Sequence, residues 1–149
     1  MKIEFSKEQF LALMKTVYLG NWLANAIRTD DKYKDYEAME DYIFSFAKEA
    51  GFDRYVNHEP KDGDRYYPTS YFEEETDVDI LKDEYDDELF WEELIERLGN
   101  RDFLNKYGKE EIRKMNREER FIKRMECEEK YEDEVEKYGV ERLEIVMNK

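Results

Sequence analysis

The first long apolar stretch of the chain, residues 10–27, predicts a helix that is mostly buried. It contains one charged residue, Lys15, although 44% of the whole chain is charged. Its apolar residues fall on all sides of a helical wheel, which is typical of a helix covered around most of its circumference. Ser6 and Gln9 form a capping-box pattern just before it. We therefore expect a buried N-terminal helix that ends near Arg28 and lies at the centre of the fold.

The rest of the chain predicts further helices separated by capping and stop signals. Apolar residues at three-and-four spacing predict a helix over residues 34–50, with Gly51 as its left-handed C-cap. Residues 53–70 contain both prolines and the pair Asp62–Gly63, which predicts a long loop with a short hairpin around that pair. Capping residues and glycines predict the remaining helices over residues 77–85, from Asp86 or Asp87 to Leu98, over residues 100–107, and over residues 116–138.

The two ends of the chain alternate with a period of two instead. Apolar and charged side chains alternate along residues 2–5, and along residues 142–147 Leu143, Ile145 and Met147 alternate with Glu144 and Val146. Such alternation is typical of half-buried strands, so we predict a short two-stranded ribbon joining the N- and C-terminal segments. The expected fold class is mainly α. A length of 149 residues fits a single helical domain over residues 1–149, built around the buried N-terminal helix.

The net charge limits the kinds of partner that the protein can bind, and the cysteine content indicates its cellular compartment. The net charge of −15, from 40 acidic and 25 basic residues, disfavours nucleic acid and anionic membranes as partners. Lys15, Asn21 and Asn25 also interrupt residues 10–27 too often for a membrane span. The single cysteine, Cys127, excludes a disulfide within the chain, and no signal-peptide pattern occurs at the start. We therefore expect a cytoplasmic protein.

Most catalytic arrangements are disfavoured by the residue types that the chain lacks. A single histidine, His58, cannot build a zinc site that needs two histidines. Neither a glycine-rich phosphate loop nor a Gly-x-Ser-x-Gly elbow occurs. Cys127 lies on an apolar face of the last expected helix, where a free cysteine acts as a small hydrophobic residue. We expect no catalytic residue and no cofactor, and we favour a protein that is not an enzyme.

Paired carboxylates supply the enzymatic alternative. Acidic residues spaced three apart lie on one helical face and can hold a magnesium ion. All-α nucleotide pyrophosphohydrolases use such pairs on facing helices, so a magnesium-dependent nucleotide hydrolase is the enzyme class to consider. Chance also produces such pairs in a chain with 40 acidic residues. The candidate pairs are Glu37 with Glu40, which we prefer, Glu93 with Glu96, and Glu129 with Glu132.

A polar stripe interrupts the apolar N-terminal helix. Tyr18, Asn21, Asn25 and Arg28 fall within one arc of its helical wheel. A buried polar group without a hydrogen-bond partner costs about 1–3 kcal/mol, so these side chains need partners. Our preferred interpretation is a polar network completed by acidic residues of a neighbouring helix. The functional alternative is the wall of a small pocket in which Arg28 faces an anion.

Charge is distributed unevenly along the second half of the chain. Residues 73–96 hold thirteen acidic residues and one basic residue, whereas residues 97–124 hold ten basic and five acidic residues. An acidic surface interspersed with aromatic side chains suits a basic protein surface. We predict that the protein acts through contacts with a basic protein partner, and a nucleic-acid-mimicking decoy and a homo-oligomer are the alternatives. The expected partner-binding residues are Asp83, Tyr85, Asp86 and Asp87.

Overall fold

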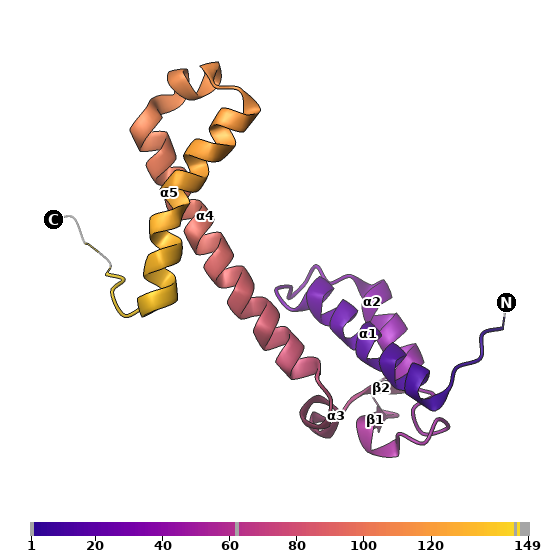
Figure 1. Cartoon of the computed structure of the whole chain (residues 1–149). Coiled ribbons are helices and arrows are strands. Elements are labelled where there is room, and N and C mark those ends of the chain that lie inside the picture. The colour runs from indigo at the N-terminus through magenta and orange to yellow at the C-terminus, as the bar shows by residue number, and fades with distance from the viewer. Residues whose placement is uncertain (1, 62, 145, 147–149) are drawn as a thin grey trace. The chain divides into compact units, whose positions relative to one another are not determined.

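The structure is a computed structural model that describes residues 2–61, 63–144 and 146. The chain is 69% helical, which confirms the predicted mainly α fold. The described residues form five α-helices, one short 3-10 helix and a two-stranded antiparallel sheet (Figure 1). In chain order these are α1 (Lys7–Asn25), α2 (Lys34–Phe44), η1 (Asp53–Tyr55), β1 (Val56–Glu59), β2 (Arg65–Pro68), α3 (Ser70–Glu75), α4 (Val78–Lys114) and α5 (Arg117–Tyr138).

The chain divides into two compact units, Met1–Glu84 (unit 1) and Tyr85–Lys149 (unit 2). Each unit has its own cluster of buried side chains. The expectation of a single helical domain stays a prediction, because α4 runs without a chain break through the boundary between the units.

Unit 1 is built on an antiparallel pair of helices, α1 and α2, which lie side by side in Figure 1. The predicted capping box at the start of α1 is confirmed. The Gln9 backbone N–H donates to Ser6 Oγ at 3.2 Å, and the Ser6 N–H donates to Gln9 Oε1 at 2.8 Å. These two bonds satisfy backbone donors that have no partner within the helix.

The core of unit 1 is centred on the ring of Phe72 in α3. This ring makes edge contacts with the rings of Tyr18, Phe44 and Tyr55, with centroid distances of 5.5, 5.2 and 5.6 Å. Phe72 and Phe44 are fully buried. Edge-to-face aromatic pairs add about 0.5–1.5 kcal/mol each to the burial of the rings. A single side chain thus joins α1, α2 and η1 to α3.

The expectation that α1 is buried around most of its circumference is wrong. Its buried residues are Met14, Tyr18 and Asn25, which lie on one face of the helix. On the opposite side, the Leu23 side chain is 64% exposed, and Ile27, just beyond the helix, is 91% exposed. The physical reason is the small size of unit 1, whose other elements cover one face of α1 and cannot enclose it.

The predicted second helix is shorter than expected, although its stop signal is confirmed. Helix α2 ends at Phe44, and hydrogen-bonded turns continue the chain to Gly51. Gly51 has the predicted left-handed conformation, with φ of 80°. The Phe52 N–H donates to the Ala47 carbonyl at 2.8 Å, which is the bond that closes a helix end of this type.

The predicted hairpin in the long loop is confirmed. Strands β1 and β2 pair antiparallel, with Val56 opposite Pro68 and Glu59 opposite Arg65. Gly63 adopts a positive φ of 73° in the turn between the strands. Asp62, the other residue of the predicted turn pair, lies outside the described residues.

The predicted terminal ribbon is wrong for the residues that the structure describes. Residues 2–5, 142–144 and 146 form no strand, and residues 145 and 147 lie outside the described residues. The chain after α5 makes turn bonds instead: the Glu141 N–H donates to the Tyr138 carbonyl, and the Leu143 N–H donates to the Val140 carbonyl, both at 3.0 Å. Local hydrogen bonds therefore replace the expected ladder.

The predicted division of residues 77–107 into three helices is wrong, because α4 is continuous over residues 78–107. The helix passes through Asp86 and Gly99 and is interrupted at Gly108, where φ is 70° and ψ is 159°. Gly99 permits a close approach to α5, because a Cβ at this position would lie 2.3 Å from Cγ of Glu128. The glycine that predicted a helix stop is therefore a packing residue, while the predicted stop at Gly108 is confirmed.

In unit 2, α4 and α5 are held together by a small core and a polar contact. Phe103, Met115 and Cys127 form the buried cluster. Asp102 of α4 accepts hydrogen bonds from the Tyr131 hydroxyl at 2.6 Å and from the Lys130 ammonium group of α5. These donors hold the pKa of the Asp102 carboxyl well below its usual range.

Replacing Phe72 by alanine tests whether this ring organises unit 1. Loss of a fully buried phenylalanine should lower the free energy of unfolding by about 3–5 kcal/mol. Hydrogen–deuterium exchange measured by mass spectrometry should show faster exchange throughout residues 7–76. Phe90→Ala is the matched control, because Phe90 is half exposed and contributes little burial. Exchange at the wild-type rate in Phe72→Ala would contradict the central role of the ring.

Candidate functional site

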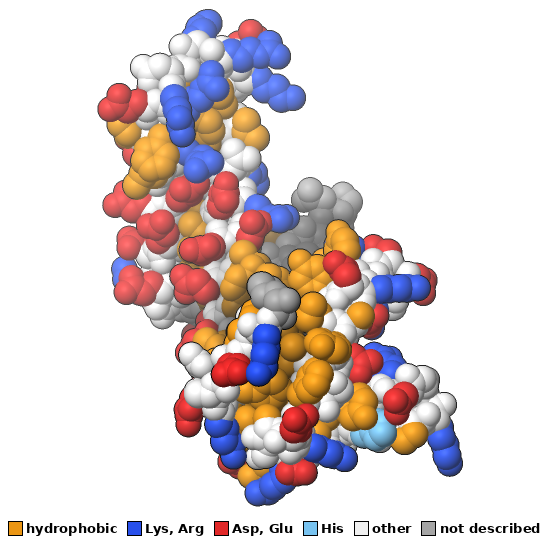
Figure 2. All heavy atoms as spheres, turned by 90° about the vertical axis from the view of Figure 1, so that its right-hand side faces the viewer, with side chains coloured by type: hydrophobic (Ala, Val, Ile, Leu, Met, Phe, Trp, Pro, Cys, Tyr) orange, Lys and Arg blue, Asp and Glu red, His pale blue; other side chains and the backbone are white. Residues whose placement is uncertain are grey.

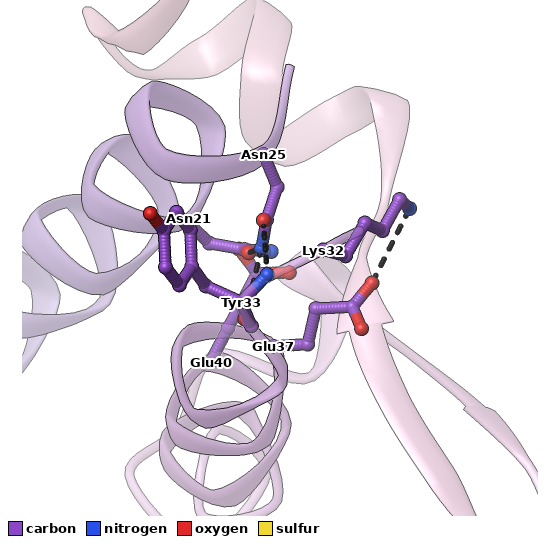
Figure 3. Close-up of polar contacts among 6 residues, drawn as sticks. All are labelled: Asn21, Asn25, Lys32, Tyr33, Glu37 and Glu40. Carbon is purple, nitrogen blue, oxygen red and sulfur yellow. Dashed lines mark hydrogen bonds and ion pairs between the residues drawn. The ribbon is translucent and has the colours of Figure 1, made fainter. Parts of the chain in front are cut away.

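The polar stripe of α1 meets the segment that leads into α2, as Figure 3 shows. Asn25 exchanges two hydrogen bonds with the backbone of Tyr33: the Tyr33 N–H donates to Asn25 Oδ1 at 2.8 Å, and Asn25 Nδ2 donates to the Tyr33 carbonyl at 3.1 Å. Asn25 Nδ2 also donates to Asn21 Oδ1 at 2.8 Å. The buried Asn25 side chain therefore ties the loop between the helices to the end of α1.

Glu40 of α2 completes this network. Asn21 Nδ2 donates to Glu40 Oε2 at 3.1 Å. Burial has the largest effect on the Glu40 carboxyl and, together with the nearby charges of Glu37 and Asp41, it raises the pKa to about 7. The hydrogen bond from Asn21 and the charge of Arg65 oppose this rise. Both protonation states of Glu40 are therefore populated at neutral pH.

Tyr18 lies on the same face of α1 as Asn25 but belongs to a second network, with partners in α3 and α4. Its hydroxyl donates to the Glu73 carboxylate and accepts a hydrogen bond from Lys82 Nζ at 2.8 Å. Burial, followed by the bond to Glu73, raises the pKa of Tyr18 to about 12. Burial opposes the charge on Lys82, but the Asp79 carboxylate at 2.6 Å and the Tyr18 hydroxyl raise the pKa of this ammonium group. Tyr18 is thus separate from the asparagines.

Arg28, the last residue of the stripe, makes local contacts near the end of α1. Its Nε donates to the Ala24 carbonyl at 2.9 Å, and its Nη1 donates to Asp31 Oδ2 at 2.7 Å. The guanidinium group also lies over the ring of Tyr33, 4.6 Å from the centroid. Its acidic partner comes from the following loop, whereas Asn21 has its partner on the neighbouring helix.

The four stripe residues thus enter three separate sets of contacts within the protein. The contacts of Asn21 and Tyr18 with Glu40 and Glu73 support the interpretation as a structural network. Binding of a small anion by the stripe stays a prediction.

Glu37 and Glu40, the preferred candidate pair for a metal ion, contact different partners. Glu37 forms an ion pair with Lys32 at 3.3 Å, while Glu40 accepts from Asn21 (Figure 3). In the part of the chain that the structure describes, no three His, Cys, Asp or Glu residues lie close enough together to hold a metal ion. His58 stacks on Tyr66 in the hairpin, with the ring centroids 4.2 Å apart.

The acidic part of α4 presents the four residues expected to bind a partner. Asp83, Tyr85, Asp86 and Asp87 are all exposed, although Asp87 Oδ1 also accepts a hydrogen bond from Trp91 Nε1 at 3.2 Å. Spacings of three and four residues place the three aspartates on one face of the helix. Tyr85 points to another face. Figure 2 shows acidic side chains gathered on unit 2 away from the basic end at the α4–α5 turn.

Two features of the structure were missed in the sequence. The spacing of Glu40 from Glu37 suggests only a metal ligand, yet Glu40 shares a helical face with Tyr36, Ile43 and Ala47, and this position among apolar residues signals burial. The second is a set of arginines, Arg117, Arg120 and Arg124, that line one cavity of unit 2. Their spacing along α5 is the signal that could have identified them.

Among the described residues, no helix combines the length and the apolar character needed to cross a bilayer. Comparison of the chain with protein-family models, curated proteins and solved structures finds no match.

Glu40→Gln tests the buried carboxyl through the pH dependence of stability. An unfolded glutamate ionises near pH 4.5, whereas folded Glu40 stays protonated up to about pH 7. Wild-type stability therefore falls as the pH rises through this window, because the folded state binds more protons. The variant lacks this contribution. Its free energy of unfolding relative to that of the wild type should therefore rise by on the order of 2 kcal/mol between about pH 5 and about pH 8.

Urea unfolding of the wild type and the variant at both pH values measures this gain. Glu49→Gln is the control, since it removes an exposed carboxyl of the same unit. An identical difference between Glu40→Gln and wild type at the two pH values would contradict the shifted pKa.

Asn25→Ala and Arg28→Ala compare the buried Asn25 with Arg28, which is only partly buried and pairs with an exposed carboxylate. Asn25→Ala removes the acceptor of the Tyr33 backbone N–H and the donor to Asn21 Oδ1, so it should lower the free energy of unfolding by about 1–3 kcal/mol. Arg28→Ala removes an ion pair with the exposed Asp31 and should cost less than about 1 kcal/mol. Thermal and urea unfolding measure both, and the reverse order would refute the assignment.

Proposed function

We propose that this protein is a cytoplasmic, non-enzymatic protein that binds a basic protein partner through the acidic segment of α4, residues 78–96. One observation carries the proposal: exposed carboxylates and large exposed apolar side chains occur together on this segment. Asp83, Asp86 and Asp87 share a helical face with Phe90, whose side chain is 51% exposed. Tyr85, on another face, is 48% exposed.

The two kinds of side chain have different roles in binding. Carboxylates attract a basic surface and mainly raise the association rate, and salt at about 0.15 M limits their reach to about 8 Å. Aromatic side chains provide affinity, because they bury a large area and are enriched among the residues that dominate binding energy. The acidic segment offers both. A solvated face kept only for solubility has no need of an exposed Phe90.

The alternatives make different demands on this helix. A nucleic-acid-mimicking decoy depends on the carboxylates, and the aromatic side chains are dispensable for it. A magnesium-dependent nucleotide hydrolase needs clustered metal ligands, and the divergent contacts of Glu37 and Glu40 give it no support. A homo-oligomer draws support from two exposed apolar side chains, Leu23 of α1 and Ile27 just beyond the helix. The free, buried Cys127 is compatible with a reducing cytoplasm.

A variant that removes three charges from the acidic segment tests the proposal. Proteins captured by the immobilised chain are identified by mass spectrometry, and the purified partner is then used in surface plasmon resonance. Asp83→Asn, Asp86→Asn and Asp87→Asn together should lower the association rate several-fold at low salt, and the difference should shrink as salt is added. Phe90→Ala should mainly raise the dissociation rate, because an anchor is lost.

The control variant removes the same amount of charge from α5. Glu132→Gln, Asp133→Asn and Glu136→Gln change three exposed carboxylates of α5 and should leave both rates near those of the wild type. Equal association rates of the two triple variants across the salt series would overturn the proposal. An unchanged dissociation rate of Phe90→Ala would favour the decoy, and capture of the chain's own untagged copies would favour a homo-oligomer.

A further inference from the structure

Unit 2 contains a cavity whose lining has the opposite charge to the chain as a whole. Its volume is about 510 Å³, within the range of small-ligand sites. No lining residue is acidic, although the chain has 40 acidic residues and 25 basic ones. The lining residues come from α4, from the segment after it and from α5: Asn100, Phe103, Met115, Arg117, Arg120, Phe121 and Arg124.

The three arginines lie on one face of α5, because they are spaced by three and four residues. Arg120 is held in place by its Nε and Nη2 atoms, which donate to the carbonyls of Met115 at 3.1 Å and Arg113 at 3.3 Å. Like charges at this spacing destabilise a helix by a few tenths of a kcal/mol per pair. A bound anion would remove this repulsion.

Partners within the protein neutralise this arginine face only in part. Arg124 forms ion pairs with Glu96 at 3.5 Å and Glu128 at 3.2 Å. Arg117 has neither a hydrogen bond nor an ion pair among the residues that the structure describes. Glu118 and Glu119 of the same helix point away from the arginine face at 100° per residue. The cavity therefore presents positive charge that is available to a ligand.

An exposed aromatic ring accompanies the arginines. The side chain of Phe121 is 55% exposed and lies on the same face of α5, between the arginines. Phe103, which is buried, supplies part of the apolar lining. Nucleotide bases stack on such exposed rings, and arginine binds phosphate with two parallel hydrogen bonds. Arginines and an exposed phenylalanine together match a ligand with both phosphate and an aromatic ring.

The net charge of the chain does not prevent such binding. Asp87 and Asn100 are thirteen residues apart on α4, which corresponds to about 20 Å along the helix. This is more than twice the screening length of about 8 Å in 0.15 M salt. Nearer to the cavity, Glu96 is paired with Arg124 at 3.5 Å. Figure 2 shows the basic side chains gathered at the α4–α5 turn.

We propose that this cavity binds a nucleoside di- or triphosphate, with the base on Phe121 and the phosphates on Arg117, Arg120 and Arg124. The size of the cavity favours a free nucleotide over a nucleic-acid strand. The site is independent of the acidic segment of α4, so it stands whether or not that segment binds a protein.

Isothermal titration calorimetry of the full chain with ADP, in EDTA and 0.15 M salt, tests the proposal. ADP should bind, whereas adenosine and pyrophosphate, which each lack half of the ligand, should bind at least tenfold more weakly. Arg117→Ala should weaken ADP binding at least tenfold without loss of the fold, because Arg117 is exposed. Phe121→Ala should weaken ADP binding and leave pyrophosphate binding unchanged.

Arg97→Ala is the matched control: it removes one exposed arginine of unit 2 that does not line the cavity. Its affinity for ADP should equal that of the wild type, and circular dichroism should be unchanged in all variants. Absence of ADP binding at millimolar concentration would overturn the proposal. Equal affinity for ADP and pyrophosphate, equal losses in Arg97→Ala and Arg117→Ala, or tighter binding of a single-stranded oligonucleotide than of ADP would also overturn it.

Discussion

The small number of elements available to cover apolar side chains governs this fold. With 44% charged residues, the chain closes two small clusters around a few large side chains. In unit 1 the ring of Phe72 contacts three other rings from three elements, so the short helix α3 carries the residue on which the packing of α1 and α2 depends. In unit 2, Phe103, Met115 and Cys127 join α4 to α5.

Because apolar contacts are few, polar side chains complete the packing. Asn25 holds the backbone of the loop that follows α1, and Glu40 accepts from Asn21 across the helix pair. Burial of a carboxyl is unfavourable when it is charged, which is why the pKa of Glu40 rises to about 7. The network therefore links the packing of α1 on α2 to pH near neutrality.

Charge is sorted along α4 rather than mixed. The acidic turns near Asp87 and the basic turns near the arginines of α5 are far enough apart to act independently in physiological salt. Sorting like charges opposes folding, since neighbouring carboxylates repel each other. This arrangement gives unit 2 two surfaces of opposite character, one suited to a basic protein and the other to an organic phosphate.

Local signals in the sequence determined much of the fold. Capping signals act within a few residues, so their geometry follows from the local sequence alone. Examples are the Ser6–Gln9 capping box, the left-handed Gly51 and the Asn116 cap that starts α5. Hairpin pairing around Gly63 is local for the same reason. The acidic partner expected for Asn21 could also be inferred, because a buried amide must be hydrogen-bonded.

Only the tertiary structure decided features that depend on contacts between distant residues. Gly99 is a residue type that often ends a helix, but here it lies inside α4, where it permits the close approach of Glu128. The apolar circumference of α1 predicted full burial, yet unit 1 has too few elements to cover Leu23. The cavity of Arg117, Arg120 and Arg124 needs α4 and α5 to be packed together before it exists. Periodicity identifies which side chains share a face, whereas the elements packed against that face determine whether they are buried, paired or open to a ligand.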